Sequence, residues 1–270
     1  MKRFIVGLLV AVPLIVLSED SAAQETAHPM YLIRQEFVRP AQMPDYETET
    51  RRWIAALGQT EVAHDVQWVT VYGPEMGYSY VVPIEGLAGI DRVRSTISTS
   101  RSDAAARWST TGGPGPTPID HVEAYVVELR PDISYLPRTV ELDLTLPFRK
   151  YHFYHTVPGL EGKFEEIATQ LVALYRKYGI EHGYRFYEHI LGSDLPVFLM
   201  VERAKSEADY ASRTASIRAT VGGAADALVG QFLQVTRSVE VMEGMTRGDL
   251  SYPPLRGPPA VGDLDILRQR

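Results

Sequence analysis

Histidine, tyrosine, arginine and glutamate residues alternate with other residues along several segments typical of β-strands. Successive side chains of a strand point to opposite faces of a sheet, so alternate positions share a face. This rule predicts a polar set on one face, made of Arg34, Glu36, Glu123, His152, Tyr154, Arg185, Tyr187, His189 and Glu240. Histidine serves as a general base, and tyrosine or arginine can stabilise an enolate-like oxygen. The set is typical of a site for an anionic or phenolic small molecule, or of a proton-transfer centre.

These residues divide into two predicted roles. We predict His152, Tyr154 and His189 as the catalytic candidates, because imidazole and phenol groups exchange protons. The others are predicted to bind the ligand: Arg34, Glu36, Glu123, Arg185, Tyr187 and Glu240. The histidines of the set lie in the second half of the chain, which favours that half as the location of the site.

Apolar neighbours indicate which face of each strand meets the helices. In the segment 122–126 every second residue is apolar and is expected to face the helices, which leaves Glu123 on the other face. In the equivalent later segment Glu240 is expected to lie on the same face as Glu123. Phe186 suits the helix side, which sends its polar neighbours to the other side. In the first strand of each half, Arg34 and Glu36 correspond to His152 and Tyr154. These positions are polar in both halves and are therefore expected to face inward, although the intervening positions also include apolar residues.

Other interpretations fit the same residues. The polar set could be a hydrogen-bonded network between two packed sheets. A haem ligand would need one inward histidine, and His152 or His189 could serve. His152 and His155 lie three residues apart, so on a strand they face opposite ways, which argues against joint metal ligation. The sequence has no GxSxG, P-loop or GxGxxG motif, and we predict neither a metal nor a cofactor.

The strands that carry Glu123 and Glu240 open a phrase that occurs twice. After six further residues the chain reads Arg130-Pro131-Asp132-Ile133-Ser134-Tyr135, and later Arg247-Gly248-Asp249-Leu250-Ser251-Tyr252, at an offset of 117 (240 − 123). A gap-free repeat of this kind indicates an internal duplication. Its Asp, Ser and Tyr are predicted to be structural, because Asp and Ser suit a turn and the ring could pack back on the end of the fold.

Hydrophobic periodicity predicts one element order for both copies: strand, helix, strand, strand, helix, strand. The first copy has predicted strands at 31–38, 66–72, 78–82 and 122–129, with helices from Pro44 and over 87–101. The second has strands at 149–157, 184–191, 197–201 and 239–245, with helices around 164–174 and 207–220. A further helix is predicted at 224–235, where the first copy has a Gly- and Pro-rich loop at 110–117. A strand at 140–146 is predicted to link the copies.

Each copy is a βαββαβ unit, the ferredoxin-like arrangement, which leaves one sheet face bare unless a second sheet covers it. Residues 30–254 resemble the dimeric α+β barrel superfamily, which includes antibiotic-biosynthesis-type monooxygenases, EthD-like proteins, NIPSNAP-like proteins and chlorite dismutases. The resemblance rests on element order and duplication. It implies an α+β fold in which two tandem ferredoxin-like repeats close one intramolecular barrel. The chain would be a pseudo-dimer that could pair further as a homodimer.

The start of the chain has the pattern of a secretory signal peptide. A basic start is followed by an apolar run over 4–17 and by Ser21-Ala22-Ala23, a small-residue cleavage signal. The run is shorter than the roughly 20 residues that span a membrane. We expect a periplasmic or secreted protein without stable membrane insertion after cleavage. The predicted divisions are a signal peptide at 1–23, repeats at 30–137 and 149–254, a linker at 138–148 and a tail at 255–270.

The amino-acid composition limits the classes of binding partner. The 270 residues include no cysteine and carry a net charge of −7. An exported chain without disulfides depends on its hydrophobic core, and this length is ample for one. An acidic chain without clustered Lys and Arg argues against nucleic acid as a partner. The sequence therefore predicts an exported protein that binds a small molecule between two sheets. A cofactor-independent monooxygenase or proton-transfer enzyme is one alternative, and a non-catalytic structural or interaction protein with a filled barrel is another.

Overall fold

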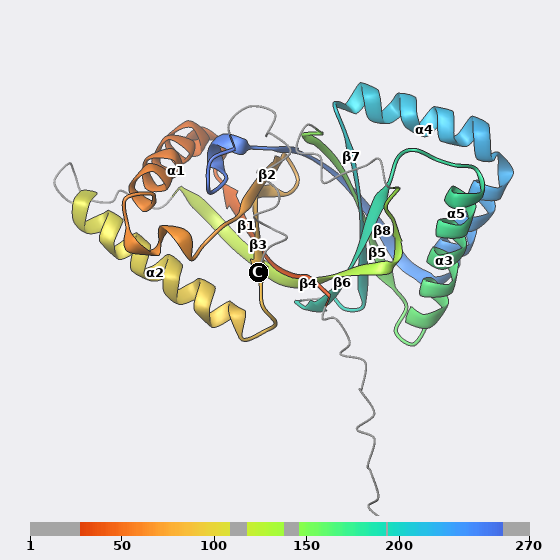
Figure 1. The fold of residues 1–270 in the computed structure, drawn as a ribbon, viewed down its shortest axis with the longest axis horizontal. Helices are drawn as coiled ribbons and strands as arrows, with labels where there is room; N and C mark the ends of the chain where they lie inside the picture. The colour runs from red at the N-terminus through yellow and green to blue at the C-terminus, as the bar shows by residue number, and fades with distance from the viewer. Residues whose placement is uncertain (1–27, 109–117, 138–145, 193, 256–270) are drawn as a thin grey trace, which may run out of the picture.

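The computed structural model describes residues 28–108, 118–137, 146–192 and 194–255. The predicted signal peptide, the loop at 110–117, nearly all of the predicted linking strand and the tail beyond residue 255 lie outside the described residues. The described part is a mixed α+β structure in which eight antiparallel strands close into one barrel (Figure 1). Within these ranges no helix combines the length and the apolar character needed to cross a membrane.

Both halves of the chain supply strands to the barrel. The N-terminal half contributes β1 (Met30–Val38), α1 (Met43–Leu57), β2 (Val69–Gly73), β3 (Gly77–Ile84), α2 (Gly89–Trp108) and β4 (Ile119–Tyr135). The C-terminal half contributes β5 (Phe148–Thr156), α3 (Glu161–Lys177), β6 (Tyr184–Leu191), β7 (Val197–Ala204), α4 (Glu207–Val221), α5 (Gly223–Val235) and β8 (Thr236–Thr246). Short 3-10 helices span Pro40–Gln42, Glu61–His64 and Gly248–Leu250. The predicted order of elements is therefore present, and so is the additional helix before the last strand.

The strand ring runs β1-β3-β2-β8-β5-β7-β6-β4, so the two halves meet at two seams, β2 with β8 and β4 with β6. The β2–β8 seam brings two backbones very close together. A Cβ atom added to Gly73 would lie 2.1 Å from the carbonyl oxygen of Glu243, so the approach requires glycine. The seams place side chains of both halves around one interior.

Helices cover the outside of the barrel on two sides (Figure 1). Beneath α1 and α2 lies a core that includes Ile54, Trp68 and Tyr78. Beneath the helices of the C-terminal half lies a second core, which includes Phe164 and Phe186. A third cluster lies inside the barrel and draws its members from strands and one turn: Val71, Met76, Tyr151, Phe153, Val197, Leu199 and Val201. Strands β5 and β7 therefore have apolar contacts on both faces.

The helices begin and pack as their sequences predict. Pro44 lies in the first turn of α1, and Tyr46 of the same helix is buried. In α3 an apolar stripe buries Phe164 and Ile167 completely. The Ser206 hydroxyl caps α4 by accepting a hydrogen bond from the backbone N–H of Asp209 at 3.1 Å.

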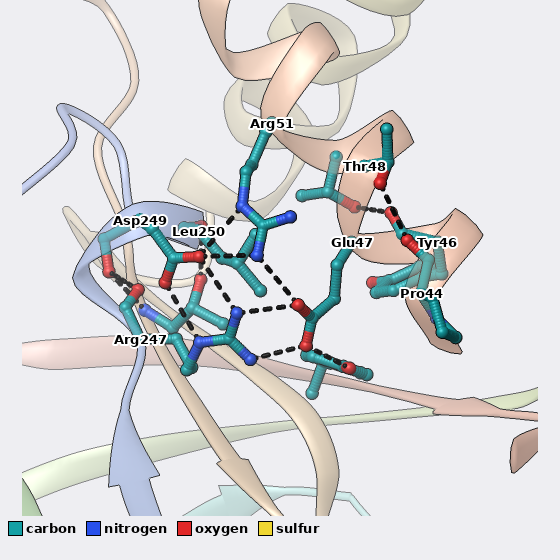
Figure 2. Close-up of polar contacts among 12 residues, drawn as sticks. Pro44, Tyr46, Glu47, Thr48, Arg51, Arg247, Asp249 and Leu250 are labelled. Carbon is teal, nitrogen blue, oxygen red and sulfur yellow. Dashed lines mark hydrogen bonds and ion pairs between the residues drawn. The ribbon is translucent and has the colours of Figure 1, made fainter. Parts of the chain in front are cut away.

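The second copy of the repeated phrase folds back onto the N-terminal half. Arg247 donates a hydrogen bond from Nη2 to Oε2 of Glu47 on α1 at 2.8 Å, and Asp249 accepts from both Arg247 and Arg51 (Figure 2). We call these four residues the first clasp. The ring of Tyr252, which follows it, is part of the core beneath α1 and α2.

The first copy of the phrase makes the reciprocal contacts. Arg130 donates from Nη1 to Oε1 of Glu165 on α3 at 2.6 Å and to Oε2 of Glu188 at 2.7 Å, and it also pairs with Asp132. We call these residues the second clasp. The hydroxyls of the repeated serines donate to the carbonyls four residues earlier, as a turn role predicts. The ring of Tyr135 reaches farther than predicted, into the core of the C-terminal half.

Candidate functional site

Arg34 and Glu36 do not face the interior of the barrel. Across the β1–β4 ladder they lie opposite Ala124 and Val122, on the face that meets the helices. Glu36 accepts a hydrogen bond from the Tyr46 hydroxyl of α1 at 2.6 Å and another from Nε of Arg34 at 2.8 Å. The predicted inward position of both residues is therefore wrong.

The predicted inward position of His152 and Tyr154 is also wrong, because the alternation of faces along the strand is shifted by one residue. The Nε2 atom of His152 lies 3.3 Å from Oε2 of Glu202, on the helix side of the sheet. Tyr154 packs between Phe164 and Phe232, with ring centroids at 5.4 and 5.3 Å. Because both faces of these strands are buried, polarity alone does not identify the interior face. An apolar cluster occupies the middle of the interior, and helix residues contact these polar groups from outside.

The other five predicted residues do occupy interior positions. Their ladder partners belong to the interior face: Gln35 for Glu123, Phe153 for Glu240, Val201 for Arg185, Leu199 for Tyr187 and Val127 for His189. They do not form one group. Glu123, His189 and Glu240 lie toward one end of the barrel, which we call the histidine end. Arg185 and Tyr187 lie toward the other, the arginine end.

The histidine end is built around His155, the last inward residue of β5. Its Nδ1 atom lies 3.3 Å from Oδ2 of Asp194, and its Nε2 atom lies 3.6 Å from Oε1 of Glu240. Neither nitrogen has a hydrogen bond within the described residues, although both are buried. Two carboxylates beside one imidazole can orient the ring.

His189 faces the same end from β6. Its ring stacks on Tyr125 of β4 at 4.6 Å and meets Phe153 edge-on at 6.0 Å. Burial, and then the neighbouring His155, lower the pKa of His189 from 6.5 to about 4. Burial is also the main cause that raises the pKa of the Tyr125 phenol well above its ordinary value. Near neutral pH the pair is therefore uncharged, and the buried Nε2 atom of His189 has no partner among the described residues.

The arginine end collects basic and phenolic side chains. Arg149 of β5 lies directly opposite Arg203 of β7, and Arg185 of β6 lies opposite Val201, two residues from Arg203 on the same face. Burial raises the pKa of Tyr31 to about 12, with a further contribution from Tyr187, so its phenol stays protonated. The two tyrosine rings meet edge-on at 5.9 Å.

Sequence reasoning missed the inward residues Tyr125, Arg149, His155 and Arg203. The signal for two of them was available, since His155 was expected to face away from His152. Shifting the phase of that strand by one residue brings both Arg149 and His155 inside. Arg203 continues the alternation of the interior residues Leu199 and Val201 on β7. No group of three His, Asp or Glu side chains in the described ranges is arranged to hold a metal ion.

Comparison with known proteins finds similarity in structure but not in sequence. No family model matches the chain, and no curated protein sequence matches it. An anthrone oxidase-like protein superposes with a TM-score of 0.53 at 9% identity, over 83% of this chain and 92% of that chain. A monooxygenase-like protein of Lactobacillus acidophilus superposes with a TM-score of 0.49 at 6% identity, over 81% of this chain and 94% of that chain. A chlorite dismutase variant of Candidatus Nitrospira defluvii superposes with a TM-score of 0.49 at 9% identity, over 83% of this chain and 93% of that chain.

The chain shares a mixed α+β fold with an eight-stranded closed barrel with the anthrone oxidase-like protein. At these identities the likeness concerns the fold alone. The predicted α+β class and the closed barrel are therefore confirmed.

Proposed function

We propose that this protein binds a small organic molecule inside the barrel, at the histidine end. One observation carries the proposal: the buried ring nitrogens of His155 and the Nε2 atom of His189 have no hydrogen bond within the described residues, and the His189 ring lies against aromatic side chains of the interior. Buried polar atoms normally have partners, and leaving one without costs about 1–3 kcal/mol. A phenolic or carbonyl oxygen of a ligand would satisfy these nitrogens. Glu123 and Glu240 would bind at the rim of the same site.

The proposal includes the origin of the barrel and its location. Two tandem ferredoxin-like repeats, fused after a duplication, account for the repeated phrase and for the reciprocal clasps. The signal pattern at 1–23 supports export to the periplasm or the medium. The mass of the protein recovered from its natural compartment tests this part, because signal cleavage predicts a chain that begins at Gln24.

A titration with 2-naphthol, a fluorescent neutral phenol, tests binding. His155→Phe and His189→Phe should each weaken naphthol affinity about tenfold, the effect of losing one hydrogen bond of about 1.4 kcal/mol. His152→Phe is the matched control, because His152 lies on the same strand as His155 but faces the helices. It should leave the affinity unchanged.

Two results would contradict the proposal. The first is the absence of saturable naphthol binding in the wild-type protein. The second is an equal effect of His155→Phe and His152→Phe on the affinity. If His155→Phe also raised the melting temperature, the interior would be a filled core and the chain a structural protein.

Proton transfer is a second candidate function, and the carboxylates beside His155 favour it. A base in this position could remove an α-hydrogen from a ketone, and Tyr125 could donate a hydrogen bond to the enolate oxygen. Exchange of the α-hydrogens of 2-tetralone in D2O provides the test. Wild type should accelerate the exchange and His155→Phe should not. Equal exchange rates for the two proteins would exclude this function.

A further inference from the structure

The arginine end of the barrel holds three guanidinium groups on neighbouring strands of the C-terminal half. Arg149 and Arg203 form a directly opposed pair across β5 and β7, and Arg185 follows on β6, beside β7. Like charges directly opposite one another on a sheet are destabilising. The arrangement therefore needs a compensating group.

The described residues supply little compensation. No carboxylate within them forms an ion pair with Arg149, Arg185 or Arg203, although ion pairs are frequent elsewhere in the molecule. Arg149 is 6% exposed and donates from Nε to the Thr246 hydroxyl at 3.0 Å. The Nε atom of Arg203 is buried and has no partner in the described ranges.

The electrostatics of Arg203 agree with this geometry. Burial, followed by the neighbouring Arg149 and Arg185, lowers the pKa of Arg203 well below its usual range. A guanidinium nevertheless keeps its proton in a protein, so the cost falls on stability rather than on charge. An anion placed among the three groups would remove that cost and satisfy the unpartnered N–H.

We propose that Arg149, Arg185 and Arg203 form a receptor for the oxyanion of a small aromatic molecule. Guanidinium groups match carboxylate and phosphate geometry in paired hydrogen bonds. The phenols of Tyr31 and Tyr187 add hydroxyl donors, and the rings of Tyr151 and Phe153 continue from the arginines toward the middle of the barrel. The expected ligand therefore has an anionic head at the arginine end and an aromatic body that points inward.

This receptor is distinct from the histidine end. Arg149 and His155 lie six residues apart on one strand, which corresponds to about 20 Å. Apolar residues of the interior cluster lie between them. Variants at one end should therefore leave binding at the other end unchanged, and the two proposals can fail separately.

Thermal unfolding at constant ionic strength tests the receptor. Benzoate, phenyl phosphate and inorganic phosphate represent a carboxylate, an aromatic phosphate and the free ion, and benzamide is the neutral match for benzoate. Benzoate or phenyl phosphate should raise the melting temperature of the wild type by about 5 °C at saturation, and benzamide should not. A stronger response to one of the two organic anions identifies the head group.

Substitution separates a receptor from a structural cluster. Arg203→Met and Arg185→Met should each weaken the preferred anion about ten- to hundred-fold. Without anion, Arg203→Met should match or exceed the wild-type melting temperature, because it removes an uncompensated buried charge. Arg52→Met, at an exposed residue of α1, is the control and should keep the full response.

Three outcomes would overturn the proposal. One is a response to benzamide equal to the response to benzoate. Another is an unchanged anion response in both arginine variants. The third is a lower melting temperature of Arg203→Met without anion together with wild-type anion affinity, which would show that the arginines only support the fold.

Discussion

At the scale of single residues, the environment of a side chain decides its chemistry more than its type. His152 and His155 belong to one strand, yet one contacts Glu202 beneath the helices and the other lies between two carboxylates inside the barrel. The sequence predicts that they face opposite ways. It does not predict which one is inside, because tyrosine, phenylalanine and histidine occupy both phases of that strand. Only packing against both halves settles the choice.

His189 should titrate with a pKa near 4, followed by NMR of the imidazole carbons, because burial disfavours its charged form. The unfolded chain has the ordinary pKa of 6.5 and binds the proton more readily. Stability from this residue is therefore fully present above pH 6.5 and is lost as the pH falls toward 4, by about 2–3 kcal/mol. In His189→Phe that part of the pH dependence should vanish. A measured pKa close to 6.5 would disprove the buried, uncharged state.

At the scale of elements, short-range pattern predicted the strands, the helices and their order, since periodicity and capping are local properties. The same pattern predicted that Glu123, Glu240 and the polar residues of β6 face inward. It failed for β1 and β5, whose two faces are both buried. The pattern also predicted too small a role for the repeated phrase. A turn role was foreseen, but each copy reaches into the opposite half, a contact that no local window contains.

The first clasp should stabilise the protein measurably. Hydrogen bonds from Arg247, and secondarily from Tyr78, lower the pKa of Glu47 from 4.5 to about 2. A carboxyl with a depressed pKa contributes stability above pH 4.5 and loses it as the pH falls toward 2. Glu47→Gln should therefore reduce the free energy of unfolding at pH 7 by about 2 kcal/mol, measured by urea denaturation.

Glu47→Gln should also flatten the pH dependence between 4.5 and 2. Glu49→Gln is the matched control, because within the described residues Glu49 forms only an exposed pair with Arg52 on the same helix. Its effect should stay below about 0.5 kcal/mol. Equal losses in the two variants would mean that the clasp adds nothing beyond a surface ion pair.

The β2–β8 seam should tolerate no side chain at Gly73. Gly73→Ala forces the two strand backbones apart, because the added Cβ would lie 2.1 Å from a carbonyl oxygen. We expect a loss of at least about 3 kcal/mol in the free energy of unfolding, measured by urea denaturation. Gly230→Ala, in the interior of α5 with open space around it, should be neutral or stabilising by up to about 1 kcal/mol. A mild effect at Gly73 would show that the seam is looser than described.

At the scale of the whole molecule, two clasped halves surround one interior with chemically different ends. One end has imidazoles beside carboxylates and a neutral His189–Tyr125 pair, and the other has three arginines with phenols. An interior of this composition is costly as a core, because its buried polar groups have too few partners. In a binding site this cost is removed, because a ligand supplies the missing partners. The clasps would then hold the two walls of that site in register.

The mass of the native protein tests this view most directly. The protein is purified without denaturant, in a buffer free of organic acids and phenols, and its native mass is compared with its mass after denaturation. A barrel with these two ends predicts that the native mass exceeds the denatured mass by at least one small molecule. The increment should persist in His152→Phe and disappear in a combined His155→Phe and Arg203→Met variant. Equal native and denatured masses in the wild type would contradict an occupied interior.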